Sequence, residues 1–239
     1  MQKNVGKMSI NYSPNFNLRK RSFSKVKYLI FHYTGMKSEK GAIKRLTNNN
    51  TEVSCHYFIK RNGKIIKIVP DLYIAWHAGI SSWKKDKFLN SNSIGIEISN
   101  PGHEYGYKDF SPSQIKSVIS LSKKLKKKYK IKKENILGHS DIAPLRKKDP
   151  GEKFPWKILY KNKICLWHNL SEQHCKKLRK IKLNDSKKFY KLLFKFGYKS
   201  TNKSYEKIKI YKNFQRRFRP QIISSTVDQE TYAILKSLI

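Results

Sequence analysis

The stretch Tyr28-Leu29-Ile30-Phe31-His32-Tyr33-Thr34 decides the fold of this chain. It is an apolar run of strand length, and a strand that is covered on both faces is apolar at nearly every position. The run therefore predicts a buried β-strand. His32 lies at its end and emerges at the edge of the sheet, where binding and catalytic sites are commonly built.

Two further stretches continue this pattern. Ser93–Ile98 predicts a buried strand that contains Glu97, and an ionised carboxylate in such a strand is costly unless it is paired, bound to a metal or placed in a polar cleft. Asn135–His139 predicts a short strand that delivers His139 to the same edge as His32. These side chains therefore suggest chemistry at one edge of the sheet.

The segment Gly138–Gly151, with the sequence GHSDIAPLRKKDPG, predicts half of a metal site. A neutral imidazole and a carboxylate suit zinc, and Lys147 brings a cation to within two residues of Asp149. Catalytic zinc normally takes three protein ligands and leaves a fourth position open for water. His139 and Asp149 therefore need a partner from far upstream, and His32 is the best candidate.

In this order the motifs resemble those of zinc N-acetylmuramoyl-L-alanine amidases of the AmpD/AmiD type, the amidase_2 family. The resemblance spans roughly the first two-thirds of the chain and rests on Phe31–Thr34, Ala75–Gly79, Ile94–Glu97 and Gly138–Gly151. It implies an α/β amidase fold. It also implies hydrolysis of the amide bond between N-acetylmuramic acid, or its anhydro form, and L-alanine in peptidoglycan or muropeptides, for cell-wall turnover or recycling.

Carried over residue by residue, the resemblance implies Zn²⁺ ligands at His32, His139 and Asp149. It places the catalytic glutamate at Glu97 and the active-site lysine at Lys147. With these roles, Glu97 is the general base for a water on zinc, and Lys147 faces the oxyanion that forms as the carbonyl is attacked.

Other residues near these motifs receive different expectations. Asp141 is the rival carboxylate, which we expect to bond to backbone, and Lys148 is the rival lysine, which we expect in solvent. Substrate contacts are predicted for Arg146 and Tyr57. For His77 two alternatives stay open, a contact with substrate and a structural role.

The rest of the pattern predicts an α/β fold with a mixed central β-sheet flanked by helices. Asn62-Gly63 joins two predicted strands within residues 56–68, because both residues accept the positive φ of a tight hairpin turn. Helical spacing appears at 41–46. Ser111–Gln114 is a capping box with proline at the first helical position, and it begins an amphipathic helix that runs to Tyr129.

We expect three parts in the chain: a zinc amidase catalytic domain at 1–160, a linker at 161–182, and a helical domain at 183–239. The third part contains three predicted short helices, at 189–198, 208–218 and 227–235. They resemble a three-helix peptidoglycan-binding domain, although Ile222–Ser225 replaces its usual glycine-rich turn. An independent wall anchor and a helical appendix packed on the catalytic domain both stay open.

The chain is strongly basic, with 53 Lys+Arg against 16 Asp+Glu and a formal net charge of +37 over 239 residues. Such a charge favours polyanions. The basic residues are mostly lysines spread over every segment, so we expect a solvated surface and no specific nucleic-acid partner. Adhesion to an anionic cell-wall or membrane surface stays open.

Three cysteines, Cys55, Cys165 and Cys175, make an odd count without CxxC spacing, which predicts free thiols. His56 follows Cys55 directly, but adjacent strand residues point to opposite faces, which argues against a thiol hydrolase. No apolar stretch approaches the ~20 residues of a membrane span.

The N-terminus lacks the apolar core of a secretory signal, which predicts a cytoplasmic protein. The helical domain favours the periplasm or cell envelope as the alternative. Oligomeric state stays open. The competing function is a non-catalytic peptidoglycan-recognition module, a class that typically lacks one zinc ligand.

Overall fold

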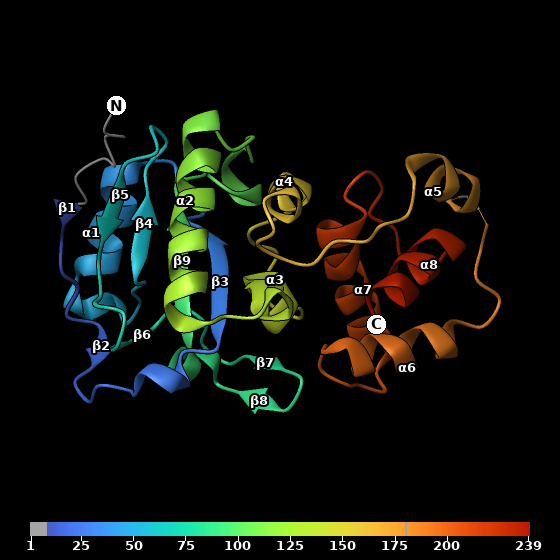
Figure 1. The fold of residues 1–239 in the computed structure, drawn as a ribbon, viewed down its shortest axis with the longest axis horizontal. Helices are drawn as coiled ribbons and strands as arrows, with labels where there is room; N and C mark the ends of the chain where they lie inside the picture. Colours follow the sequence, from blue (N-terminus) through green and yellow to red (C-terminus); the bar gives the residue numbers. More distant parts are fainter. Residues whose placement is uncertain (1–8, 180) are drawn as a thin grey trace.

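A mixed β-sheet of six strands forms the N-terminal part of the molecule (Figure 1). The computed structural model describes residues 9–179 and 181–239. The strand order is β1-β5-β4-β9-β3-β10, and only β4 and β5 run antiparallel to each other. The strands are β1 (Ser9–Ile10), β3 (Tyr28–Tyr33), β4 (Tyr57–Ile59), β5 (Ile65–Lys67), β9 (Ser93–Ile98) and β10 (Ile136–Gly138).

Strand β3 is covered on both faces, which explains why its apolar run is almost continuous. Along β3, Leu29 and Phe31 face one core and Tyr28 and Ile30 face another, because successive side chains point to opposite sides. Parallel pairing sets His32 opposite Glu97 in β9. The predicted buried strand is therefore confirmed, and it lies inside the sheet between β9 and β10.

Helix α2 (Pro112–Tyr129) covers one face of the sheet (Figure 1), where Val118, Leu121 and Leu125 pack on the strands. The predicted capping box is present, with the Ser111 side chain accepting from the backbone N–H of Gln114 at 3.2 Å. Helix α1 (Glu39–Thr47) packs against part of the opposite face through Ala42 and Leu46.

The predicted hairpin also forms, since β4 and β5 pair antiparallel around Asn62-Gly63. Gly63 has φ of +84°, which a glycine adopts without strain. Two further pairs of short strands are antiparallel: β2 (Phe16–Asn17) with β6 (Ile74–Ala75), and β7 (Ser82–Trp83) with β8 (Asp86–Lys87). Short 3-10 turns η1–η5 span Phe23–Lys25, Asn49–Thr51, Leu89–Asn92, His103–Tyr105 and Lys133–Asn135.

The C-terminal third is helical, as predicted. The remaining helices are α3 (His139–Ile142), α4 (Trp156–Lys161), α5 (Glu172–Leu178), α6 (Ser186–Phe196), α7 (Ser204–Phe218) and α8 (Gln229–Leu238). The last three are those predicted from sequence. Helix α5 lies within the stretch 161–182 predicted as a linker.

The C-terminal helices pack on the sheet domain (Figure 1). One hydrophobic cluster contains Tyr28 and Ile30 of β3 together with Phe189 of α6 and Phe214 of α7. The core of the sheet domain also continues beyond residue 160, because Ile164 is fully buried in it. The packed appendix is thus the arrangement that the structure shows, while the domain boundaries stay a prediction.

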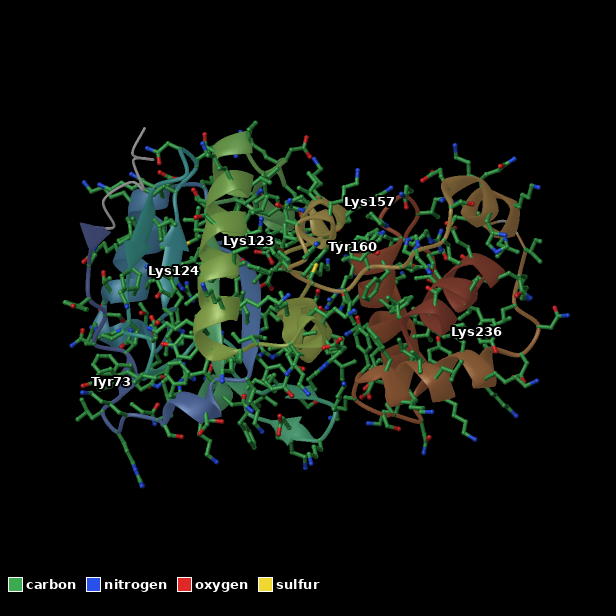
Figure 2. All side chains as sticks on the ribbon, in the orientation of Figure 1. Tyr73, Lys123, Lys124, Lys157, Tyr160 and Lys236 are labelled. Atoms are coloured by element: carbon green, nitrogen blue, oxygen red, sulfur yellow. The ribbon has the colours of Figure 1, made fainter. Side chains whose placement is uncertain are left out.

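Exposed lysines occur all over the molecule. Lys123 and Lys124 on α2, Lys157 on α4 and Lys236 on α8 are all exposed, on three different helices (Figure 2). The predicted free thiols are confirmed, and all three are buried. Among residues 9–179 and 181–239, no helix combines the length and the apolar character that crossing a bilayer requires.

Candidate metal centre and active site

Three side chains that are distant in sequence meet at the carboxyl ends of the central strands. β10 pairs with β3 so that Gly138 lies opposite Phe31, which places His139 beside His32. Asp149 joins them from the loop after α3. His32 Nδ1 lies 2.9 Å from His139 Nδ1 and 3.1 Å from Asp149 Oδ2, and the last two atoms are 3.0 Å apart. The predicted ligand set therefore converges at one point.

This triangle has the dimensions of a metal site. Ligand atoms about 2.0–2.1 Å from a tetrahedral zinc ion lie roughly 3.3 Å from one another, so the three atoms here need to spread by only a few tenths of an ångström to hold the ion. His32, His139 and Asp149 form the one group of this kind found within the described residues, and all three are buried.

The electrostatic surroundings favour the forms that bind a metal. Burial, with a further contribution from His139, lowers the pKa of His32 to about 4. Burial alone would raise the pKa of Asp149, but the imidazoles of His139 and His32 hold it below its usual range. A neutral imidazole and an ionised carboxylate result, and these are the protonation states that metal binding requires.

Glu97 lies on the strand next to His32 and lines the same cleft. Its Oε2 atom is buried and has no hydrogen-bond partner among the residues that the structure describes. Burial, followed by the nearby charge of Asp149, raises the pKa of Glu97 well above its ordinary value, while Lys147 opposes the shift. A carboxyl group in this state is suited to accept and return a proton near neutral pH.

The cleft in front of these residues has a volume of about 890 Å³. Lys147, which is partly exposed, lines it together with Arg146, whereas Lys148 is exposed but also borders the cleft. The Arg146 guanidinium donates to the carbonyl of Ile80, with its Nε 3.2 Å away, and to the carbonyl of Ala78. Arg146 therefore stands at the cleft wall, as its predicted substrate contact requires, and is anchored to the 78–80 loop.

His77 also borders the cleft, but both of its ring nitrogens have protein partners. Nδ1 lies 3.0 Å from His32 Nε2, and Nε2 lies 3.2 Å from Ser93 Oγ. The imidazole is 8% exposed. These contacts favour the structural alternative for His77 over the substrate contact.

The prediction that Tyr57 contacts substrate is wrong. Its ring is buried in the core beneath α2, and its hydroxyl donates to Asp71 Oδ1 at 2.5 Å. Tyr57 occupies a position on β4 whose side chain points to the face opposite that of Phe58, and Phe58 in turn pairs with Glu97. Both faces of β4 are buried, so the sequence around Tyr57 does not show to which face its side chain points.

Asp141 has the architectural role expected for it, with partners that the sequence did not suggest. Its Oδ2 accepts from the backbone N–H of Gly138 at 2.7 Å and from Arg217 at 2.5 Å. Its Oδ1 accepts from the Tyr198 hydroxyl at 2.6 Å. The C-terminal helices thus hold the start of the loop that carries His139.

A second contact from α7 reaches the same loop further along. The Asn213 amide donates to the carbonyls of Pro144 and Lys147 at 2.8 and 3.1 Å. Sequence reasoning missed both Asn213 and Arg217. A signal was present, because these two polar residues interrupt the stripe of Ile210, Phe214 and Phe218 on a predicted helix.

The sequence model of the N-acetylmuramoyl-L-alanine amidase family, Amidase_2, matches residues 22–152 of the chain. N-acetylmuramoyl-L-alanine amidase AmiD of Escherichia coli is 34% identical in an alignment of 234 residues that covers 91% of this chain and 84% of AmiD. The 1,6-anhydro-N-acetylmuramyl-L-alanine amidase AmpD of Haemophilus influenzae is 40% identical over 105 residues, covering 44% of this chain and 55% of AmpD.

Solved structures extend the likeness to the whole chain. AmiD of E. coli, in complex with the substrate anhydro-N-acetylmuramic acid-L-Ala-D-gamma-Glu-L-Lys, superposes with a TM-score of 0.81 at 32% identity and covers 93% of this chain and 91% of its own. AmpDh3 of Pseudomonas aeruginosa superposes with a TM-score of 0.80 at 29% identity, over 100% and 96%. With its His-His-Asp group at the edge of the sheet, the chain belongs to the N-acetylmuramoyl-L-alanine amidase family.

Proposed function

We propose that this amidase is zinc-dependent and hydrolyses the amide bond between anhydro-N-acetylmuramic acid and L-alanine in muropeptides. The observation that carries the proposal is the convergence of His32, His139 and Asp149 within 4.8 Å, beside Glu97 and Lys147 in a single cleft. Two imidazoles and one carboxylate, with an open cleft on the fourth side, form a donor set suited to catalytic zinc.

The residues around the metal divide the work of hydrolysis. When bound, zinc lowers the pKa of a water ligand towards ~7 and polarises a carbonyl group. Glu97 accepts the proton of the attacking water and delivers it to the nitrogen of the departing L-alanine, since its raised pKa makes both transfers accessible. The Lys147 ammonium group, which also lines the cleft, faces the negative charge that develops on the carbonyl oxygen.

The choice of substrate is supported by the two structural relatives. AmiD of E. coli is in complex with an anhydro-N-acetylmuramic acid tripeptide, and AmpDh3 of P. aeruginosa is in complex with anhydromuramic pentapeptide. Both relatives align with more than nine-tenths of this chain. Cleavage of soluble fragments accords with the cytoplasmic location expected above, whereas cleavage of intact peptidoglycan accords with the cell envelope.

A comparison of two substrates tests the proposal. Purified protein is stripped of metal, reloaded with zinc, and incubated with an anhydro-muropeptide or with intact sacculi. Mass spectrometry is expected to detect free stem peptide from the anhydro-muropeptide only with the zinc-loaded protein. Release that is equally fast without metal would contradict the zinc mechanism. Release from sacculi alone would overturn the substrate assignment and favour the envelope.

A further inference from the structure

The hydrogen bonds behind the metal site fix the protonation of one ligand. A neutral imidazole carries a single N–H, so a histidine that binds a metal through one ring nitrogen holds its proton on the other. In the zinc site proposed above, on which this inference rests, the His32 Nδ1 atom faces the other two ligands. Its Nε2–H then points to Nδ1 of His77, 3.0 Å away.

The direction of each further hydrogen bond follows from the one before. Because His77 Nδ1 accepts from His32, His77 must carry its own proton on Nε2, which lies 3.2 Å from Ser93 Oγ. The Ser93 hydroxyl donates to the carbonyl of Leu89 at 2.5 Å, so its lone pairs are free to accept from His77. One consistent arrangement of protons therefore runs from the ligand to the backbone of η3.

The surroundings of His77 are built to hold its ring in this position. His32, His77 and Ser93 are 1%, 8% and 0% exposed, so water does not compete for these bonds. Asn90 Oδ1 accepts from the backbone N–H groups of His77 and Ala78 at 3.1 and 2.7 Å. These bonds fix the backbone that carries the ring.

Gly95 makes the room for that ring. A Cβ atom at position 95 would lie 2.4 Å from Cγ of His77, which no side chain contact permits. Glycine in the middle of β9 weakens a strand, so its presence needs a local reason. The close approach of the His77 imidazole supplies that reason.

We propose that His77 is a positioning residue, which holds His32 in the tautomer and orientation that present Nδ1 to zinc, with Ser93 holding His77 in turn. Outer hydrogen-bond partners of metal-binding histidines fix the ring and raise its basicity, and their loss typically costs 10–100-fold in metal affinity. His77 contributes to catalysis through the metal ligand and makes no contact with the reacting atoms.

Zinc affinity of the full-length chain tests the proposal, measured by competition with a chromogenic chelator. His77→Leu removes the acceptor, and we expect zinc binding to weaken about 10–100-fold. His77→Asn places an acceptor oxygen near the position of Nδ1, so it is expected to recover most of the affinity. Ser93→Ala leaves the His77 Nε2–H without its acceptor, and we expect a smaller loss. His174→Leu, at an exposed histidine on α5, is the control and leaves the affinity unchanged.

The outcomes separate this inference from the function on which it rests. If the unsubstituted chain binds no zinc, the proposed function fails. If it binds zinc and His77→Leu binds equally well, only the role of His77 is overturned. An affinity for His77→Asn that is no better than that of His77→Leu would also overturn it, because packing alone would then explain the loss. Should His77→Leu not fold, Ser93→Ala decides: a zinc affinity equal to that of the unsubstituted chain would overturn the proposal, because the acceptor that holds His77 would then be without effect.

Discussion

Two carboxylates near the metal centre, the partly buried Glu97 and the buried Asp141, have opposite surroundings. Glu97, on the sheet side, has a buried oxygen without a hydrogen-bond partner among the described residues. Asp141, on the loop side, accepts from Gly138, Tyr198 and Arg217. A buried carboxylate is stable when it is paired and reactive when it is not. Asp141 therefore stabilises the fold around the site, whereas Glu97 is suited to proton transfer.

The metal ligands are likewise held by two different parts of the fold. His32 comes from a central strand and is held by the β-ladder and by His77. His139 and Asp149 come from a segment outside the sheet, which is held by contacts from the C-terminal helices, including Asn213. The helical region is therefore part of the scaffold of the active site, whatever it binds in addition.

Glu97→Gln gives the largest expected effect on activity. The amide cannot accept a proton from water, so we expect hydrolysis of an anhydro-muropeptide to slow by about 100- to 10,000-fold. The zinc content should stay at that of the original chain, because Glu97 is not a ligand. The rate and the metal content are measured on one preparation by chromatography of products and by atomic absorption. A variant that keeps its rate would remove Glu97 from the mechanism.

Asp141→Asn is the same acid-to-amide substitution at the other carboxylate, and we expect it to lower the free energy of unfolding. It leaves the guanidinium of Arg217, which is 2% exposed, buried without its counter-charge. Breaking a buried ion pair in this way costs about 3–5 kcal/mol of the free energy of unfolding. Denaturant unfolding of metal-free protein measures the change. The substitution Lys212→Met on α7 is the control, since Lys212 is partly exposed and is not among the described partners of Asp141, which are Gly138, Tyr198 and Arg217.

A smaller effect is expected on the pH dependence of stability, in which Glu97→Gln should differ from the original chain. In metal-free protein the pKa of Glu97 is raised above its unfolded value of about 4.3, so the folded state binds more protons than the unfolded state in the window between the two values. The contribution of Glu97 is fully present below pH 4.3 and is lost as the pH rises through the folded pKa. Glu97→Gln should therefore gain stability over the original chain as the pH rises. Parallel pH profiles of the two melting temperatures would contradict this expectation.

Much of the site followed from the sequence because its ligands lie at the ends of regular elements. Apolar runs of strand length located His32 and Glu97, and the spacing of GHSDIAPLRKKDPG located His139 and Asp149. Tyr57 was misplaced because the burial of both sheet faces removes the alternation that would reveal which way a side chain points.

The supporting contacts did not follow from the sequence. The His32–His77 and Asp141–Arg217 pairs join residues 45 and 76 positions apart, and no local pattern encodes such a distance. Packing of the C-terminal helices on the sheet creates the second of these pairs. Polar residues within an apolar helical stripe, such as Arg217, are the sequence feature that best indicates them.

In the proposed function, His32, His139 and Asp149 bind one zinc ion between them. Anomalous diffraction at the zinc absorption edge, from crystals of the zinc-loaded protein, locates that ion. We expect a single strong peak about 2.0–2.2 Å from Nδ1 of both histidines and from the Asp149 carboxylate. A zinc ion bound elsewhere, or one held by only two of these side chains, would contradict it.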